Sequence, residues 1–160
     1  MIHSGKFLQF IEKTVELNMP VCFQLTPKYF FELKDLFSKF PDQIFVFDHM
    51  ARPEKGTTVN ELLFEELLAL SEFSNVYVKL SGLNYYSAGT APYEDTWPLL
   101  LAAKDTFTPQ RCIWGSDFPF VNDHWSYGDQ IKMFQNDIGF TEAELIWVMG
   151  KTADSIWWNA

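Results

Sequence analysis

Four short runs of apolar residues recur along this chain, and longer segments with helical periodicity separate them. The runs cover residues 21–25, 44–48, 76–80 and 111–115. Continuous apolar strands that alternate with amphipathic helices are typical of parallel strands covered on both faces. The sequence therefore predicts an α/β fold with four parallel strands in sequential order, and chain chirality makes the crossovers between them right-handed.

The spacing of the runs indicates which kind of parallel α/β fold the chain has. A full (β/α)₈ barrel has about 250 residues in eight units, or about 31 residues for each unit, and the runs recur irregularly around that period. A glycine-rich dinucleotide turn follows none of the runs, which weakens a Rossmann interpretation. We expect a TIM-type (β/α)₈ barrel, of which residues 1–160 form a single part with roughly the last four βα units.

The helical segments carry recognisable start and stop signals. Thr26 is a plausible cap for a helix that has Pro27 at its first position. Thr141 and Glu144 have the spacing of a capping box. Gly150 is expected to break the helix that this box opens, before a short amphipathic end.

Charge and cysteine usage restrict the partners and the compartment. The net charge of −9 argues against nucleic acid or an anionic membrane as the main partner. No apolar stretch approaches the roughly 20 residues of a membrane span, and Glu12, Lys13 and Glu16 interrupt any signal peptide. Cys22 and Cys112 are interpreted as reduced, buried core thiols. The expected compartment is the cytoplasm.

Polar or ionisable residues end all four apolar runs. These ends include Gln24, Asp48-His49, Lys79 and Asp117. In a parallel barrel, catalytic groups stand at the carboxyl ends of the strands. Such residues can also cap strands and the helices that follow them, but the complete set favours a functional site that binds a small molecule.

Each candidate side chain has a chemical and a structural interpretation. His49 can ligate a metal, donate to a substrate carbonyl or carry a proton, or it can bond to Asp48. Asp117 can activate water and then protonate a leaving group, or it can order a loop. Arg52 can clamp a substrate carboxylate or lie on the surface. Lys79 can bind substrate or form a structural ion pair.

Four motifs carry a family resemblance when they are taken in order. The chain resembles the second half of the amidohydrolase-related (amidohydrolase 2) hydrolases, which include 2-pyrone-4,6-dicarboxylate lactonases and fuconolactonase-like sugar lactonases. This resemblance implies that Asp117 is the base for water and that His49 binds metal or polarises the substrate carbonyl. It also makes Arg52 a candidate for holding a substrate carboxylate. The motifs are IFVFDHMARP (44–53), NVYVKLSGL (75–83), RCIWGSDFPF (111–120) and GKTADSIWW (150–158).

The chain departs from the family pattern at the expected metal ligands. The His-x-His pair of the family's first strand is absent, and Gln24 or Thr26 stands where many metal-using relatives have a histidine. Thr152 replaces the usual asparagine. His49 and Asp117 are then only two candidate metal ligands, against the three protein ligands typical of catalytic zinc. The cofactor is therefore a divalent metal such as zinc, or there is none.

Three functions remain open at this stage. The leading interpretation is hydrolysis of a lactone or similar carbonyl ester by an Asp-activated water, in a barrel that includes the missing half. The second is a metal-dependent decarboxylase of the same superfamily. The third is an inactive half-barrel that serves as an association module. Because a half-barrel exposes strand edges and an apolar inner face, we expect a homodimer or a partner that supplies the missing strands.

Overall fold

A four-stranded parallel sheet organises the computed structural model, which describes residues 5–26, 29–120 and 125–158. The strand order is β1-β2-β3-β4, and every neighbouring pair is parallel. The predicted fold class, strand order and direction are therefore confirmed. The strands are β1 (Val21–Phe23), β2 (Phe45–Phe47), β3 (Val76–Leu80) and β4 (Cys112–Trp114).

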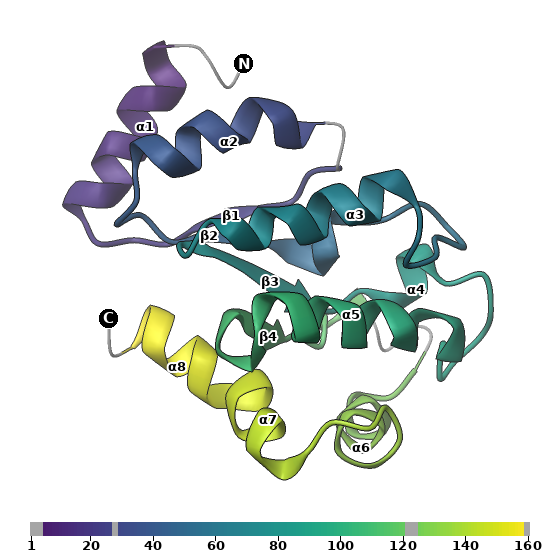
Figure 1. Cartoon of the computed structure of the whole chain (residues 1–160). Helices are drawn as coiled ribbons and strands as arrows, with labels where there is room; N and C mark the ends of the chain where they lie inside the picture. The colour runs from purple at the N-terminus through teal and green to yellow at the C-terminus, as the bar shows by residue number, and fades with distance from the viewer. Residues whose placement is uncertain (1–4, 27–28, 121–124, 159–160) are drawn as a thin grey trace.

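Helices connect the strands in the alternation that the periodicity predicts. In Figure 1, α2, α3 and α5 follow one another from the top of the view downward as the chain passes from strand to strand. The helices are α1 (Gly5–Glu16), α2 (Phe30–Lys39), α3 (Leu62–Ala69), α4 (Leu83–Tyr86), α5 (Trp97–Phe107), α6 (Tyr127–Asn136), α7 (Glu142–Ile146) and α8 (Thr152–Trp157).

The predicted helix signals have different outcomes. Thr141 and Glu144 form the expected capping box at the start of α7. Gly150 does not break the helix, because it lies in a π-helical turn that joins α7 to α8. Thr152, which begins α8, is fully buried and its hydroxyl donates to the Pro109 carbonyl at 3.1 Å, so the continued helix is anchored beside β4. Pro27 lies outside the described residues.

The outer face of the sheet carries the aromatic part of the core. Phe45 and Phe47 alternate with Val46 and therefore point to the same side. The Phe37 ring lies 5.0 Å from that of Phe45, and the Phe30 ring lies 5.2 Å from that of Phe47. Each fully buried phenylalanine contributes roughly 1.5–3 kcal/mol relative to an exposed one. This packing fixes α2 on the sheet.

The C-terminal helix α8 packs on the opposite, inner face. Val46 and Ile113 belong to a second buried cluster with Ile156, and Tyr77 and Trp157 pack against that cluster. The inner face that the half-barrel prediction leaves open is therefore partly covered by the chain itself.

Cys22 stands on that inner face at the edge of the sheet. It alternates with buried Val21 and Phe23 on β1, pairs in register with Val46, and is exposed. The prediction of a buried thiol is wrong here because β1 is an edge strand, with a sheet neighbour on one side only among the residues that the structure describes. The second cysteine, Cys112, is buried as predicted.

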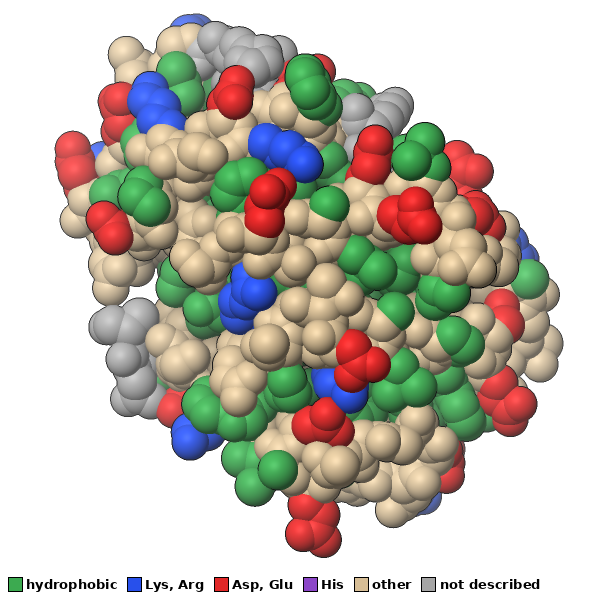
Figure 2. Space-filling model, viewed as in Figure 1, with side chains coloured by type: hydrophobic (Ala, Val, Ile, Leu, Met, Phe, Trp, Pro, Cys, Tyr) green, Lys and Arg blue, Asp and Glu red, His purple; other side chains and the backbone are tan. Residues whose placement is uncertain are grey.

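The surface shows mixed charge on the face drawn in space-filling form. Lys and Arg side chains are scattered singly among more numerous acidic ones in Figure 2. Within the described part of the chain, every helix is too short or too polar to cross a bilayer.

Candidate functional site

A cleft of about 790 Å³ opens at the carboxyl ends of the strands. Four of the predicted site residues contribute to its lining, one from the end of each strand or from the strand itself. Aromatic side chains of Trp157 and Trp158 also line it. The four predicted residues are Gln24, His49, Lys79 and Asp117.

His49 and Asp117 face each other within this cleft. The Nε2 atom of His49 lies 3.6 Å from Oδ1 of Asp117, and both side chains are largely shielded from solvent. The other ring nitrogen of His49, Nδ1, lies 2.8 Å from the Ser81 hydroxyl. Burial lowers the pKa of His49, and the opposing carboxylates of Asp117 and Asp48 offset only part of that effect. The neutral imidazole is therefore the favoured form near pH 7.

Asp117 is held by a second side chain on its other oxygen. The Tyr85 hydroxyl donates to Oδ2 of Asp117 at 2.7 Å. This hydrogen bond is the main reason that the pKa of Tyr85 is raised, so the phenol stays protonated. Because Oδ2 is engaged, Oδ1 is the carboxylate oxygen that faces His49 and the cleft.

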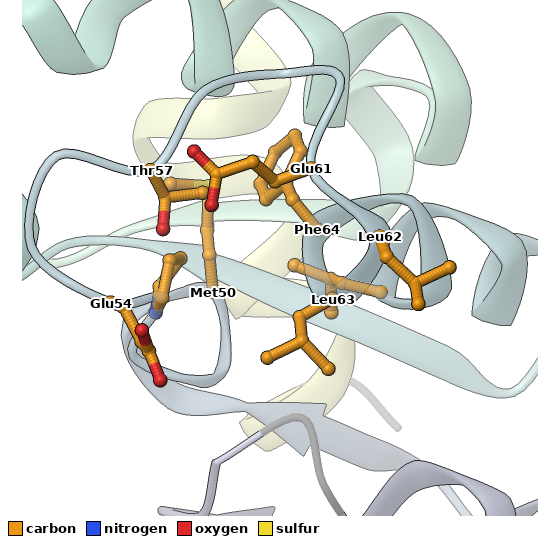
Figure 3. Close-up of a pocket in the computed structure, with 9 residues that line it drawn as sticks. Met50, Glu54, Thr57, Glu61, Leu62, Leu63 and Phe64 are labelled. Atoms are coloured by element: carbon orange, nitrogen blue, oxygen red, sulfur yellow. The ribbon is translucent and has the colours of Figure 1, made fainter.

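The backbone around His49 forms an unusual turn. Four consecutive residues, 49–52, have φ between 48° and 59°, and the Arg52 amide donates to the His49 carbonyl at 2.8 Å. A left-handed conformation costs an L-residue roughly 1–2 kcal/mol, so packing must hold this turn. Met50 and Ala51 are fully buried. Figure 3 shows Met50 extending toward Thr57 on the outer side of the turn.

Lys79 forms an ion pair on the inner face. Its Nζ lies 2.7 Å from Oδ1 of Asp48, the residue before His49, and 5.6 Å from the centre of the Trp157 ring. The structural interpretation of Lys79 is thus present in the geometry, next to its position in the cleft. A role in substrate binding stays a prediction for Lys79.

Arg52 and Gln24 hold different positions relative to the cleft. Arg52 is exposed, and its guanidinium carbon lies 4.3 Å from the centre of the Tyr85 ring rather than among the residues that line the cleft. Gln24 lines the cleft beyond β1 and is exposed. Their roles in substrate binding stay predictions.

The sequence analysis does not predict the hydrogen-bond partners of His49 and Asp117, which we call the facing pair. Ser81 directly follows β3 and neighbours His49 across the sheet, and this polar strand end was visible in the sequence. Tyr85 lies in a segment to which the sequence analysis assigns no role. The short helix α4 turns the Tyr85 hydroxyl toward Asp117. No signal in the sequence alone points to that contact.

The donor set falls short of a zinc site. Within the described ranges, no three His, Cys, Asp or Glu side chains gather as a metal site. His49 Nε2 and Asp117 Oδ1 are two donors, whereas catalytic zinc typically has three protein ligands. The described residues therefore do not fit zinc by themselves, and no chemical step below passes through a metal.

Comparisons with known proteins find relatives of this chain in sequence and in fold. The amidohydrolase family model covers residues 3–157. A 4-sulfomuconolactone hydrolase from Rhizobium radiobacter is 35% identical over 88 residues, which are 55% of this chain and 28% of that protein. An L-fucono-1,5-lactonase from Burkholderia ambifaria is 32% identical over 108 residues, which are 66% of this chain and 36% of that protein.

A solved structure matches almost the whole chain. It is an amidohydrolase from Burkholderia multivorans with bound zinc, with a TM-score of 0.84, 21% identity, and coverage of 97% of this chain and 58% of that one. At this identity the likeness shows the fold, and it confirms the predicted half-barrel. The chain thus spans little more than half of this neighbour and about a third of the two relatives.

Proposed function

The chain belongs to the amidohydrolase family, and from that premise we propose that it hydrolyses a lactone or similar carbonyl ester. The single observation that carries the proposal is the approach of His49 Nε2 to within 3.6 Å of Asp117 Oδ1 inside the cleft. The two relatives named as lactone hydrolases support a small-molecule lactone as the substrate class.

The geometry assigns complementary roles to the facing pair. A water between Asp117 and the substrate attacks the carbonyl carbon while Oδ1 of Asp117 takes one of its protons. His49 donates from Nε2 to the carbonyl oxygen and stabilises the negative charge that develops there. The tetrahedral intermediate then collapses, the ring C–O bond breaks, and Asp117 returns the proton to the leaving alkoxide. The product is a hydroxy acid.

An acid-release assay tests this proposal. The purified chain is incubated with a panel of five- and six-membered lactones, and proton release is followed in a weakly buffered indicator solution. Release well above that of an Asp117→Asn variant supports the proposal. If the chain and this variant give equal rates on every lactone, the chain by itself is not a lactone hydrolase, and the association-module interpretation is favoured for the isolated chain.

A divalent metal such as zinc belongs to the proposal only as a property of a complete barrel. The zinc-bound neighbour supports it, and His49 and Asp117 are the two side chains that would contribute to such a site. Elemental analysis of an assembly that includes the missing half tests this assignment, because zinc is expected there with the wild-type chain and is expected to be lost with His49→Ala.

A second polypeptide surface is proposed to complete the barrel. A groove of about 420 Å³ runs along α1 and β1, where Phe10, Leu17 and Met19 are each more than half exposed. Apolar surface left in water costs about 25 cal/mol per Å², and an unpaired strand edge readily pairs with another chain. A second copy, or a partner that contributes strands, fits this groove. The cytoplasm stays the predicted compartment.

A further inference from the structure

One short segment, residues 81–85, touches both members of the facing pair. The Ser81 hydroxyl lies 2.8 Å from His49 Nδ1, and the Tyr85 hydroxyl donates to Asp117 Oδ2 at 2.7 Å. We propose that the 81–85 segment is a positioning element that orients His49 and Asp117 together, so that Nε2 and Oδ1 are the atoms left facing the cleft. This inference rests on the proposed hydrolase function of the same site.

Gly82 makes the close approach of the two rings possible. A Cβ atom at this position would lie 2.6 Å from His49 Nδ1 and 2.9 Å from Cδ2 of Tyr85, and both distances are shorter than real contacts allow. The φ of Gly82 is 67°, a conformation that glycine adopts without strain. The rings of His49 and Tyr85, 5.5 Å apart and edge to face, therefore both pack against the Gly82 backbone.

The left-handed turn holds the same arrangement from the other side. It brings the His49 ring against Gly82 while Met50 is buried in the outer core. Figure 3 shows Met50 reaching between Thr57 and Phe64. At the far end of the turn, the Arg52 guanidinium stacks over the Tyr85 ring. The turn thus contacts both ends of the 81–85 segment.

The contacts of His49 with Ser81 and Asp117 together favour one ring tautomer. A neutral imidazole has one N–H, and the hydrogen bond at one nitrogen sets the role of the other. The carboxylate oxygen Oδ1 of Asp117 is an acceptor only and faces Nε2, which favours the proton on Nε2, and in that tautomer the Ser81 hydroxyl donates to Nδ1. That tautomer is the one that can donate to a substrate carbonyl. Tyr85 has the corresponding effect on Asp117, because its hydrogen bond to Oδ2 leaves Oδ1 as the oxygen that faces the cleft.

Nitrogen NMR of the His49 ring in the full chain tests the serine contact directly. The wild-type spectrum is expected to show unprotonated Nδ1 and protonated Nε2. Ser81→Ala is expected to give a mixture of both tautomers, whereas Ser81→Thr, which keeps the hydroxyl, restores the wild-type pattern. Ser38→Ala, at an exposed position on α2, is the matched control. An unchanged His49 spectrum in Ser81→Ala would overturn the proposal.

Kinetics on the best lactone give the second readout. Ser81→Ala and Tyr85→Phe are each expected to lower kcat about 10-fold with little change in KM, the scale of one lost hydrogen bond that orients a reacting group. Equal losses in Tyr127→Phe, an exposed tyrosine on α6, would count against the assignment of Tyr85. The expected NMR pattern without any lactone hydrolysis would support the positioning role and reject the proposed function.

Discussion

His49 and Asp117 both have left-handed backbone conformations, with φ of 54° and 56°, although neither is a glycine. Each follows a strand of the parallel sheet, β2 for His49 and β4 for Asp117. Non-glycine residues in this region are uncommon and persist where the surroundings hold them, often at functional sites. Both members of the pair that we propose to be catalytic therefore have strained backbone, although Asn18, Tyr93 and Thr108 share this conformation elsewhere in the chain.

Replacing Asp117 by asparagine tests the proposed base. Asparagine has the same shape and tolerates left-handed φ, so the fold and the free energy of unfolding should change little. Turnover should fall by about 10²-fold or more, the scale of a lost acid–base group. The measurement is kcat on the best lactone, with far-UV circular dichroism as the check on folding. Asp137→Asn, at an exposed position after α6, should keep wild-type turnover. Near-normal turnover with asparagine at 117 would mean that another group activates water.

The buried imidazole should make stability depend on pH. The pKa of His49 is lowered from 6.5, chiefly by burial. An unfolded chain therefore takes up this proton at a higher pH than the folded one, and the free energy of unfolding falls as the pH drops below about 6.5 toward the folded pKa. Urea unfolding from about pH 7.5 to about pH 5.5 should show a steeper loss in the wild type than in His49→Gln. Identical losses in the two proteins would contradict this cause.

Adding one methyl group at Gly82 should disturb the site more than the fold. The Cβ of Gly82→Ala would collide with the His49 ring, and its φ of 67° would be strained for alanine. We expect kcat to fall by more than it does in Ser81→Ala, and the free energy of unfolding to fall by about 1–2 kcal/mol. Gly128→Ala, where a Cβ meets nothing within 4 Å, is the control for both measurements. A Gly82→Ala variant with wild-type kcat would show that the rings can move aside.

The position of the candidate site could be predicted from the sequence, because catalytic groups of parallel barrels lie at the carboxyl ends of the strands. Apolar runs identify the strands, and polar residues that end them must meet at one edge of a parallel sheet. Gln24, His49, Lys79 and Asp117 are such residues, and all four line one cleft in the structure. To expect these residues at one edge, it is enough to know where each strand ends, and the direction of each side chain is not needed.

The contacts between these residues could not be predicted in the same way. Lys79 lies on the cleft side of β3, and its ion pair depends on the position of the Asp48 carboxylate at the end of the neighbouring strand, which the sequence does not give. Tyr85 reaches Asp117 only because α4 forms directly after Gly82. The continuation of the last helix through Gly150 has a similar origin, since tertiary anchoring outweighs the low intrinsic helix propensity of one glycine.

Arg111 should be important for stability rather than for chemistry. Its guanidinium donates to the carbonyls of Phe73 at 2.8 Å and Ser71 at 3.1 Å, while its Nε donates to the Phe107 carbonyl at 3.0 Å. Lysine has no planar fork and cannot keep all three bonds. Arg111→Lys should lower the free energy of unfolding by about 1–3 kcal/mol, since hydrogen bonds to charged groups are strong.

Chemical unfolding in urea measures this effect. The control is Lys132→Ala, which removes an exposed ion pair with Asp129 and should cost at most about 1 kcal/mol. Turnover of Arg111→Lys at a temperature where it is folded should equal that of the wild type. Equal stability of Arg111→Lys and wild type would show that water replaces the lost bonds.

The two cysteines should report on whether the inner face is open in solution. Burial raises the pKa of Cys112 to about 12, so this thiol stays protonated and shielded in the native chain. Cys22 is exposed on the inner face at the edge strand β1, although its pKa is also raised. A disulfide reagent at mildly alkaline pH should therefore modify one thiol in the native chain and two after unfolding. Cys22→Ser should abolish the native reaction, and a native Cys112 that reacts as fast as Cys22 would contradict the packing of β4.

If a second copy closes over β1, the Cys22 reaction should slow as the protein concentration rises. A rate independent of concentration would mean that this face stays open and that no second copy covers it.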